Sequence, residues 1–156
     1  AEMVARAARE LPPSPRMEWV GASAADFVRH GAFDLVLSSG CYSAIRDKAK
    51  CRQAIEAGCQ SVRPGGRLIC IDPFHRHKYL ARVRMGPDEV MAIVQASGLV
   101  HEHFGGILFW PMRELLANSR ASDSTIERGF ATGERWLQRW GERRWSDYKV
   151  LVFRRP

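Results

Sequence analysis

The feature that most constrains the fold of this chain is a glycine turn between the end of a predicted helix and an apolar run. The turn is residues 63–66 (RPGG), and the run after it is residues 68–71 (LICI). Pro64 cannot continue a helix, and the paired glycines permit a tight reversal. Another apolar run, residues 33–38, precedes the helix and is typical of a strand buried on both faces of a parallel sheet. This order predicts the central crossover of an open α/β sheet.

The rest of the chain alternates in the same way. Pro87 suits a first helical position, and Gly98 suits the end of the same helix. Helices are predicted at residues 2–11, 47–62, 87–98 and 122–145, one or two helical turns at 24–30, and strands at 17–20, 33–38, 68–71, 101–110 and 148–153. The alternation predicts an α/β fold, a three-layer sandwich with a Rossmann-like, mainly parallel sheet.

Length and composition predict one domain over residues 1–156, with an inserted helical segment at about 111–145. No apolar run is long enough for a membrane span. The four cysteines lack paired metal-ligand spacing and fall at apolar positions, so we expect reduced core thiols in a cytoplasmic protein. The chain opens inside a predicted helix without Met, so we expect a fragment of a longer protein.

The net charge of +7 favours an anionic partner only weakly, because the basic residues are dispersed. Arg135, Arg139, Arg143 and Arg144 share a late helix with glutamates, a pattern typical of a solvated helix face. Trp136, Leu137 and Trp140 fall at helical spacing, and we expect them to dock this helix on the rest of the protein.

Segments of the chain resemble class I S-adenosylmethionine-dependent methyltransferases, in the order that this family has them. The segments are AEMVARAAREL for the helix after the second strand, MEWVGASAADF for the third strand and its loop, FDLVLSSG for the fourth strand, VRPGGRLICIDP for the fifth, GPDEVMAIVQASGL for the helix before the sixth, and DYKVLVFRR for the seventh. The resemblance implies S-adenosyl-L-methionine as cofactor. It covers most of the chain apart from about 110–145.

The resemblance places cofactor contacts in the loops after two strands, at Gly21, Ala22 and Ser23 and at Ser38, Ser39 and Gly40. The family usually has Asp directly after the glycine of the first loop, where this chain has Ala22. The family's glycine-rich loop, and the acidic residue that ends its second strand, would lie before Ala1. Without those strands the edge at residues 35–37 is bare, so we expect either that the natural chain is longer, or that this fragment is poorly stable or pairs with another copy through this edge.

His75 follows the fifth strand at its ligand-facing end and is the candidate base or acceptor contact. A surface histidine in a basic loop is the other interpretation. Tyr42, Phe74 and Trp110 are candidates for binding the acceptor, with ordinary packing as the alternative for Tyr42 and Trp110. The pairs His75/His77 and His101/His103 have no third ligand at suitable spacing, so we predict no metal site.

Four functions remain open, one of which is a dehydrogenase, since that class shares the same alternation of strands and helices and its fingerprint would also lie before Ala1. The leading one is a methyltransferase acting on a small-molecule acceptor, with an oxygen as the candidate methylated atom. An RNA or protein methyltransferase is favoured by the net charge. The third is a basic module that binds nucleic acid or a partner and retains a degenerate methyltransferase fold. Activity of this fragment alone is doubtful, because the loops that would hold much of the cofactor are absent from it.

Overall fold

The computed structural model describes residues 2–11, 14–15, 17–75, 85–117 and 119–156. The elements, in chain order, are α1 (Glu2–Glu10), β1 (Phe33–Ser39), the 3-10 helix η1 (Tyr42–Ala44), α2 (Lys48–Ser61), β2 (Val62–Asp72), α3 (Pro87–Ala96), β3 (Val100–Phe109), α4 (Trp110–Ala117), α5 (Asp123–Trp140), α6 (Glu142–Trp145) and β4 (Ser146–Arg154). No helix in these ranges is long and apolar enough to cross a membrane.

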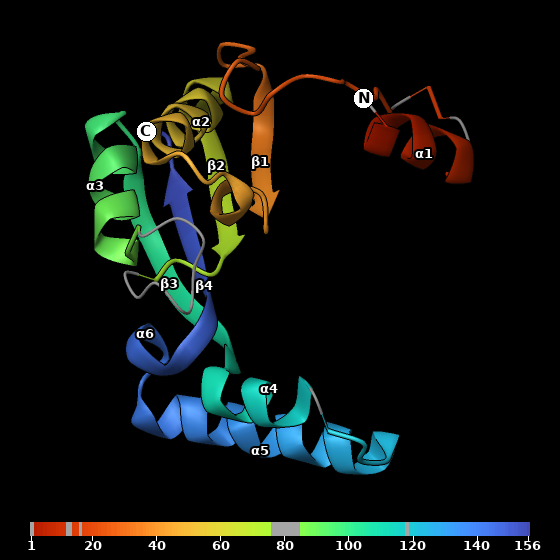
Figure 1. The fold of residues 1–156 in the computed structure, drawn as a ribbon. Coiled ribbons are helices and arrows are strands. Elements are labelled where there is room, and N and C mark those ends of the chain that lie inside the picture. Colours follow the sequence, from red (N-terminus) through yellow and green to blue (C-terminus); the bar gives the residue numbers. More distant parts are fainter. Residues whose placement is uncertain (1, 12–13, 16, 76–84, 118) are drawn as a thin grey trace.

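The strands form one sheet in the order β1-β2-β4-β3. β1 and β2 pair in parallel, whereas β4 runs antiparallel to both β2 and β3. β1, β2 and β3 therefore point the same way, and their carboxyl ends lie at one edge of the sheet (Figure 1). The predicted Rossmann-like, mainly parallel α/β sheet is confirmed.

Helices α2 and α3 cover one face of this sheet (Figure 1). Alternate side chains of the two central strands point into that layer. Leu68 and Cys70 of β2 and Leu151 and Phe153 of β4 are fully buried there, together with Ile55 of α2. The hydrophobic core thus lies between β2, β4 and two helices, and its burial stabilises the fold.

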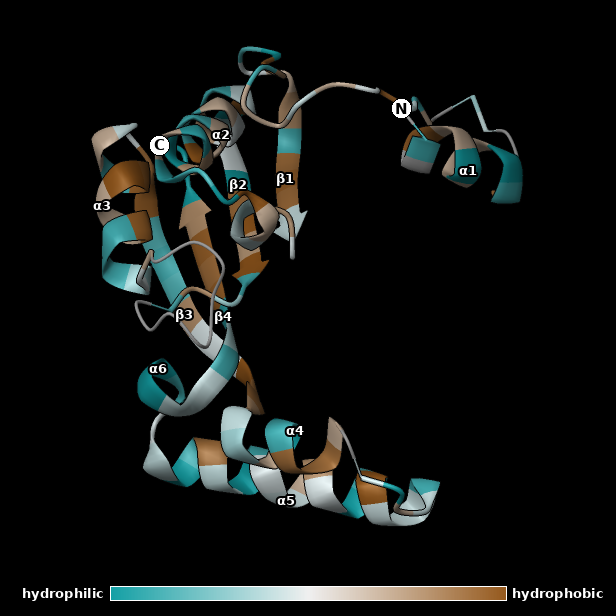
Figure 2. Ribbon diagram, viewed as in Figure 1, coloured by the Kyte–Doolittle hydropathy of each residue, from teal (hydrophilic) through white to brown (hydrophobic). Residues whose placement is uncertain are grey.

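The opposite face of the sheet is more open. Leu35 and Leu37 of β1 are 52% and 57% exposed, and Ile69 and Ile71 beside them are half-buried. Figure 2 shows that hydrophobic residues run along β1, β2 and β4. The expectation that residues 33–38 are buried on both faces is wrong, because α1 lies apart from the sheet (Figure 1). The described helices therefore supply one helical layer of the expected sandwich.

The RPGG turn has a different role from the simple reversal that the sequence predicts. Pairing with β1 already begins at Val62, and the register shifts before Arg67. Gly65 has φ of 78°, and a Cβ on Gly66 would lie 2.8 Å from the carbonyl oxygen of Asp34. The backbone of this turn also exchanges two hydrogen bonds with Arg155, of 2.9 and 3.0 Å. Glycine is needed here because β1 and the C-terminal segment approach the turn closely.

One sequence prediction near the N-terminus is wrong. Residues 17–20 form no regular strand and pair with no strand of the described sheet, although the outer edge of β1 is open. Residues 24–30 contain one hydrogen-bonded turn, in which the N–H groups of Asp26 and Phe27 donate to the carbonyl of Ser23. Farther on, the predicted helix 122–145 breaks at Gly141, which has φ of 99°.

β3 ends at Phe109, and the chain bends toward α4 one residue earlier, at Leu108. This residue has φ of 62°, a left-handed conformation that is uncommon for leucine. Its N–H donates to the Oε1 atom of Glu134, at 2.9 Å, so the carboxylate of α5 holds the bend. Helices α4 and α5 consequently lie beyond the carboxyl edge of the sheet (Figure 1).

The open edge of β1 generates a prediction about self-association. We expect Leu37→Lys to lower concentration-dependent association, because a charged side chain on an edge strand opposes strand pairing between copies. Sedimentation velocity across a concentration series measures this change. Leu115→Lys on α4 is the matched control, since Leu115 is also exposed, at 69%, but lies away from the edge. A monomeric wild-type chain at every concentration would contradict the prediction.

Candidate functional site

The candidate site begins where β1 and β2 end. Because the two strands are parallel and adjacent, the loops that follow them meet at the same edge, where open α/β sheets bind ligands. Gly40 turns the chain over this edge with φ of 64°, and its N–H donates to the carbonyl of Ile71, at 2.9 Å. The predicted cofactor segment, Ser38, Ser39 and Gly40, is therefore held directly beside the end of β2.

Asp72, the last residue of β2, fastens the two loops together. Its carboxylate is fully buried and accepts one hydrogen bond from the Ser38 hydroxyl and one from the Ser43 N–H, each at 3.0 Å. Burial raises the pKa of Asp72 above its ordinary value, while these hydrogen bonds oppose the shift. Asp72 thus sets the path of residues 38–43.

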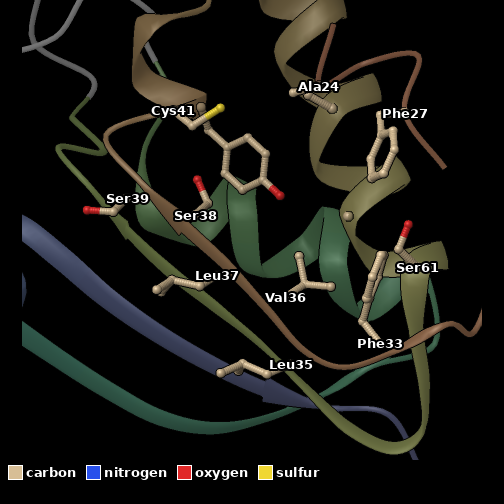
Figure 3. A pocket seen from close by; sticks show the side chains of 13 residues that line it. Ala24, Phe27, Phe33, Leu35, Val36, Leu37, Ser38, Ser39, Cys41 and Ser61 are labelled. Atoms are coloured by element: carbon tan, nitrogen blue, oxygen red, sulfur yellow. The ribbon is translucent and has the colours of Figure 1, made fainter. Parts of the chain in front are cut away.

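A cavity of about 460 Å³ lies beside β1, between that strand and α2. Phe27, Phe33 and Val36 lie toward its helical side, whereas Leu35 and Leu37 lie on the other side of β1 (Figure 3). Its polar lining residues are Ser38, Ser39, Cys41, Tyr42 and Ser61. Ser39 lies on the same side of β1 as Leu35 and Leu37, and Ser61 lies near Phe33 at the start of the strand (Figure 3). The cavity is mostly apolar and suits a ligand with a flat apolar part.

A second cavity, of about 590 Å³, adjoins the first and shares three lining residues with it, Ala24, Phe27 and Phe33. Ala22 lines this second cavity together with Phe33, so the structure brings one residue of the predicted 21–23 loop near the start of β1. No residue of the predicted 38–40 segment lines this cavity. Glu18 also lines it. Arg29 lies 2.5 Å from the Glu18 carboxylate and holds the pKa of Glu18 below its usual value. Gly21 and Ser23 are not among the lining residues.

The predicted acceptor residues do not come together at these cavities. Tyr42 lines the first cavity, but it is buried, and its hydroxyl occupies the space that a Cβ on Gly58 would need. Phe74 is fully buried in the core. Trp110 lies on α4, where its ring stacks on Trp145 with a centroid distance of 6.3 Å. The structure therefore gives Phe74 and Trp110 packing contacts, while Tyr42 also borders the cavity.

His75 belongs to a separate buried cluster near the start of β4. Its Nε2 atom lies 2.7 Å from the carbonyl oxygen of Asp147 and 3.6 Å from the Asp147 carboxylate. Arg113 of α4 lies 2.7 Å from the other oxygen of that carboxylate. With Nε2 donating to a carbonyl, the lone pair of the imidazole is at Nδ1. The partner residue of the predicted pair, His77, lies outside the described residues.

Lys149 is a site feature that the sequence interpretation missed. The side chain is 1% exposed, and its Nζ donates to the carbonyl and the hydroxyl of Ser146, at 2.5 and 2.8 Å. Burial lowers the pKa of Lys149 to about 8, partly opposed by the nearby Asp147 carboxylate. The sequence does carry a signal for this burial. Lys149 alternates with Leu151 and Phe153, so the three side chains share the buried face of β4.

The cysteines mostly match the expectation of core thiols. Cys51, Cys59 and Cys70 are buried, and burial raises the pKa of Cys51 and of Cys59 to about 11. Cys41 is exposed, which corrects its predicted core position, because it follows the Gly40 turn at the rim of the sheet. Within the described part of the chain, no group of three His, Cys, Asp or Glu side chains is placed to hold a metal ion.

No model of a known protein family matches the sequence, and no curated protein matches it significantly. Solved structures do match. The N-methyltransferase NodS from Bradyrhizobium japonicum WM9, in complex with S-adenosyl-L-homocysteine, is 16% identical with a TM-score of 0.62, over 98% of this chain and 61% of that one. A methyltransferase complex with the Haloferax volcanii Trm112 activator gives 17% identity and a TM-score of 0.61, over 99% and 68%.

The [4+2]-cyclase SpnF also matches, at 18% identity with a TM-score of 0.59, over 97% of this chain and 61% of that one. This chain therefore spans between three-fifths and about two-thirds of the length of these three proteins. The comparisons confirm the resemblance to the fold of class I S-adenosylmethionine-dependent methyltransferases. They do not assign a reaction, since one of the similar structures is named a cyclase.

The Asp72 anchor generates a prediction about stability. We expect Asp72→Ala to lower the free energy of unfolding by about 1–3 kcal/mol, because the Ser38 hydroxyl and the Ser43 N–H lose their acceptor in the core. Asp72→Asn keeps an acceptor for Ser43 and removes a buried charge, so it stays at least as stable as wild type at pH 7. Urea unfolding at several pH values measures both.

The sign of the pH effect follows from the raised pKa of Asp72. A group with a raised folded pKa contributes most stability below its unfolded pKa, and that contribution is lost as pH rises through the folded value. The advantage of Asp72→Asn over wild type should therefore appear as pH rises from about 4 and level off above the folded pKa. Equal destabilisation by Asn and Ala at pH 7 would show that the negative charge itself is required.

Proposed function

We propose that this protein is a methyltransferase that uses S-adenosyl-L-methionine and methylates a small-molecule acceptor, at an oxygen atom. The observation that carries the proposal is the pair of adjoining cavities beside β1, the first of which reaches the carboxyl end of that strand, in a fold shared with structures that bind this cofactor or its product. The cofactor brings an activated methyl group, and most of the protein's contribution is to position the reacting groups.

The residues present fit part of the cofactor. The apolar walls from Phe27 and Phe33 suit a purine ring, and the Ser38 hydroxyl, which donates to Asp72, can still accept a hydrogen bond from a polar group near the end of β1. Glu18 is the carboxylate that lines the second cavity, and it is already paired with Arg29. Groups for the amino-acid end of the cofactor do not line either cavity in the described residues.

His75 is our candidate for the base. A base is needed when the acceptor is a hydroxyl, since methylation leaves a proton to be removed. The Nε2 atom of His75 is fixed by the carbonyl of Asp147, which leaves the lone pair of Nδ1 to take up the proton. His75 follows the end of β2 by three residues, at the carboxyl edge of the sheet, and lines neither cavity.

Cofactor binding is tested by isothermal titration of the natural full-length protein with S-adenosylhomocysteine. We expect saturable one-to-one binding. Ala24→Phe should weaken it at least tenfold, because Ala24 lines both cavities and the larger ring would occupy them. Ala8→Phe on the exposed face of α1 is the control and should leave the affinity unchanged. Absence of binding by the full-length protein would overturn the methyltransferase proposal.

The role of His75 is tested with a pair of variants in an assay of S-adenosylhomocysteine release from a panel of phenols and carboxylic acids. His75→Gln places an amide donor near the Asp147 carbonyl but has no base, so we expect about a hundredfold loss of turnover with little change in melting temperature. His75→Asn shortens the side chain and should lose stability as well. Full turnover by His75→Gln would leave His75 a purely structural residue.

A further inference from the structure

Helix α5 carries a groove of about 440 Å³, lined by Thr132, Arg135, Trp136, Arg139 and Trp140. We refer to these five residues as the Arg–Trp face. None of them lines the cavities beside β1, and none belongs to the His75 cluster. A ligand bound to this face would therefore occupy a site separate from the one proposed for methyl transfer.

The two tryptophans are not simply core residues. Leu137, between them, is 1% exposed and docks the helix as the sequence predicts, but Trp136 and Trp140 are 39% and 51% exposed. Both rings pack edge-on against Phe109, at centroid distances of 5.8 and 5.5 Å. They also stack on each other at 5.6 Å, with 16° between their planes. The result is a pair of fixed, nearly parallel indoles that border open solvent.

The charge on this face is positive and uncompensated. Arg135 donates from Nη2 to the Thr132 hydroxyl, at 3.1 Å, which lays its guanidinium along the helix. No carboxylate of the described residues forms an ion pair with Arg135 or Arg139. Glu134, the nearest acid in sequence, instead accepts the N–H of Leu108. An anionic ligand would meet two free cations here.

We propose that the Arg–Trp face binds single-stranded nucleic acid. Each tryptophan directly follows an arginine, and the two pairs are four residues apart, a helical rise of about 6 Å. This arrangement repeats the two contacts that single strands use, a base stacked on an aromatic ring and a phosphate beside a cation. Stacking accepts any base, so little sequence preference is expected.

A membrane surface explains the face less well. A helix that lies on a bilayer buries a broad apolar side, and its basic residues flank that side. Here no aliphatic side chain lines the groove, and a bilayer would gain only two partly exposed indoles. The chemistry of the lining therefore favours a polymer that carries flat rings and negative charges over a bilayer surface.

The test is fluorescence anisotropy of the full-length protein with a labelled twelve-nucleotide poly(U) RNA. We expect binding that weakens roughly sevenfold between 50 and 200 mM salt, as two phosphate contacts on a single strand require. Arg135→Gln with Arg139→Gln should weaken binding at least tenfold. Lys50→Gln with Arg52→Gln on α2 is the control of equal charge change, and it should weaken binding less than threefold.

The stacking contact has its own measurement. Bound RNA should quench tryptophan fluorescence, and Trp140→Leu should reduce that quenching; if this variant unfolds, the arginine variants still decide the proposal. Equal weakening by both double variants, or no RNA binding by wild type at 50 mM salt, would overturn it. Binding to phosphatidylserine vesicles without RNA binding would also overturn it. Cofactor titration is a separate measurement, so failure of this site leaves the methyltransferase proposal standing.

Discussion

One-sided burial of the sheet is the constraint on which the rest of the structure depends. α2 and α3 pack on one face, where Leu68, Cys70, Leu151 and Phe153 are fully buried. The other face and the free edge of β1 stay largely open among the described residues. The stability of this chain thus comes mainly from a single interface between helices and sheet. The exposed apolar strand β1 is the reason to expect association between copies.

The same central strand organises the carboxyl edge of the sheet. β2 hydrogen-bonds to β1 on one side and to β4 on the other, so Asp72 at its end lies between the loop after β1 and the start of β4. A buried carboxylate with two hydrogen-bond donors fixes that loop more firmly than apolar packing alone. The shape of the candidate site is therefore set by buried core residues rather than by a flexible surface loop.

Polar groups are used differently in two places at the carboxyl edge of the sheet. Near the start of β4, His75 and Arg113 both contact Asp147, and the Lys149 ammonium donates to Ser146. On α5, Arg135 and Arg139 lack such acidic partners among the described residues, and two tryptophans are left half-exposed beside them. Unsatisfied charge next to exposed aromatic surface is the kind of feature that ligand binding accounts for.

The sequence by itself determined the local elements and their order. Proline, glycine and apolar period place α2, α3, β1 and the strands around RPGG, because those signals act over a few residues. Only the tertiary structure decided which faces are covered, that residues 17–20 form no strand, and that Lys149 and Asp72 are buried. Those outcomes depend on partners far along the chain. The same holds for Trp136 and Trp140, whose spacing predicted docking, while Phe109 and Leu137 decide how much of each ring stays exposed.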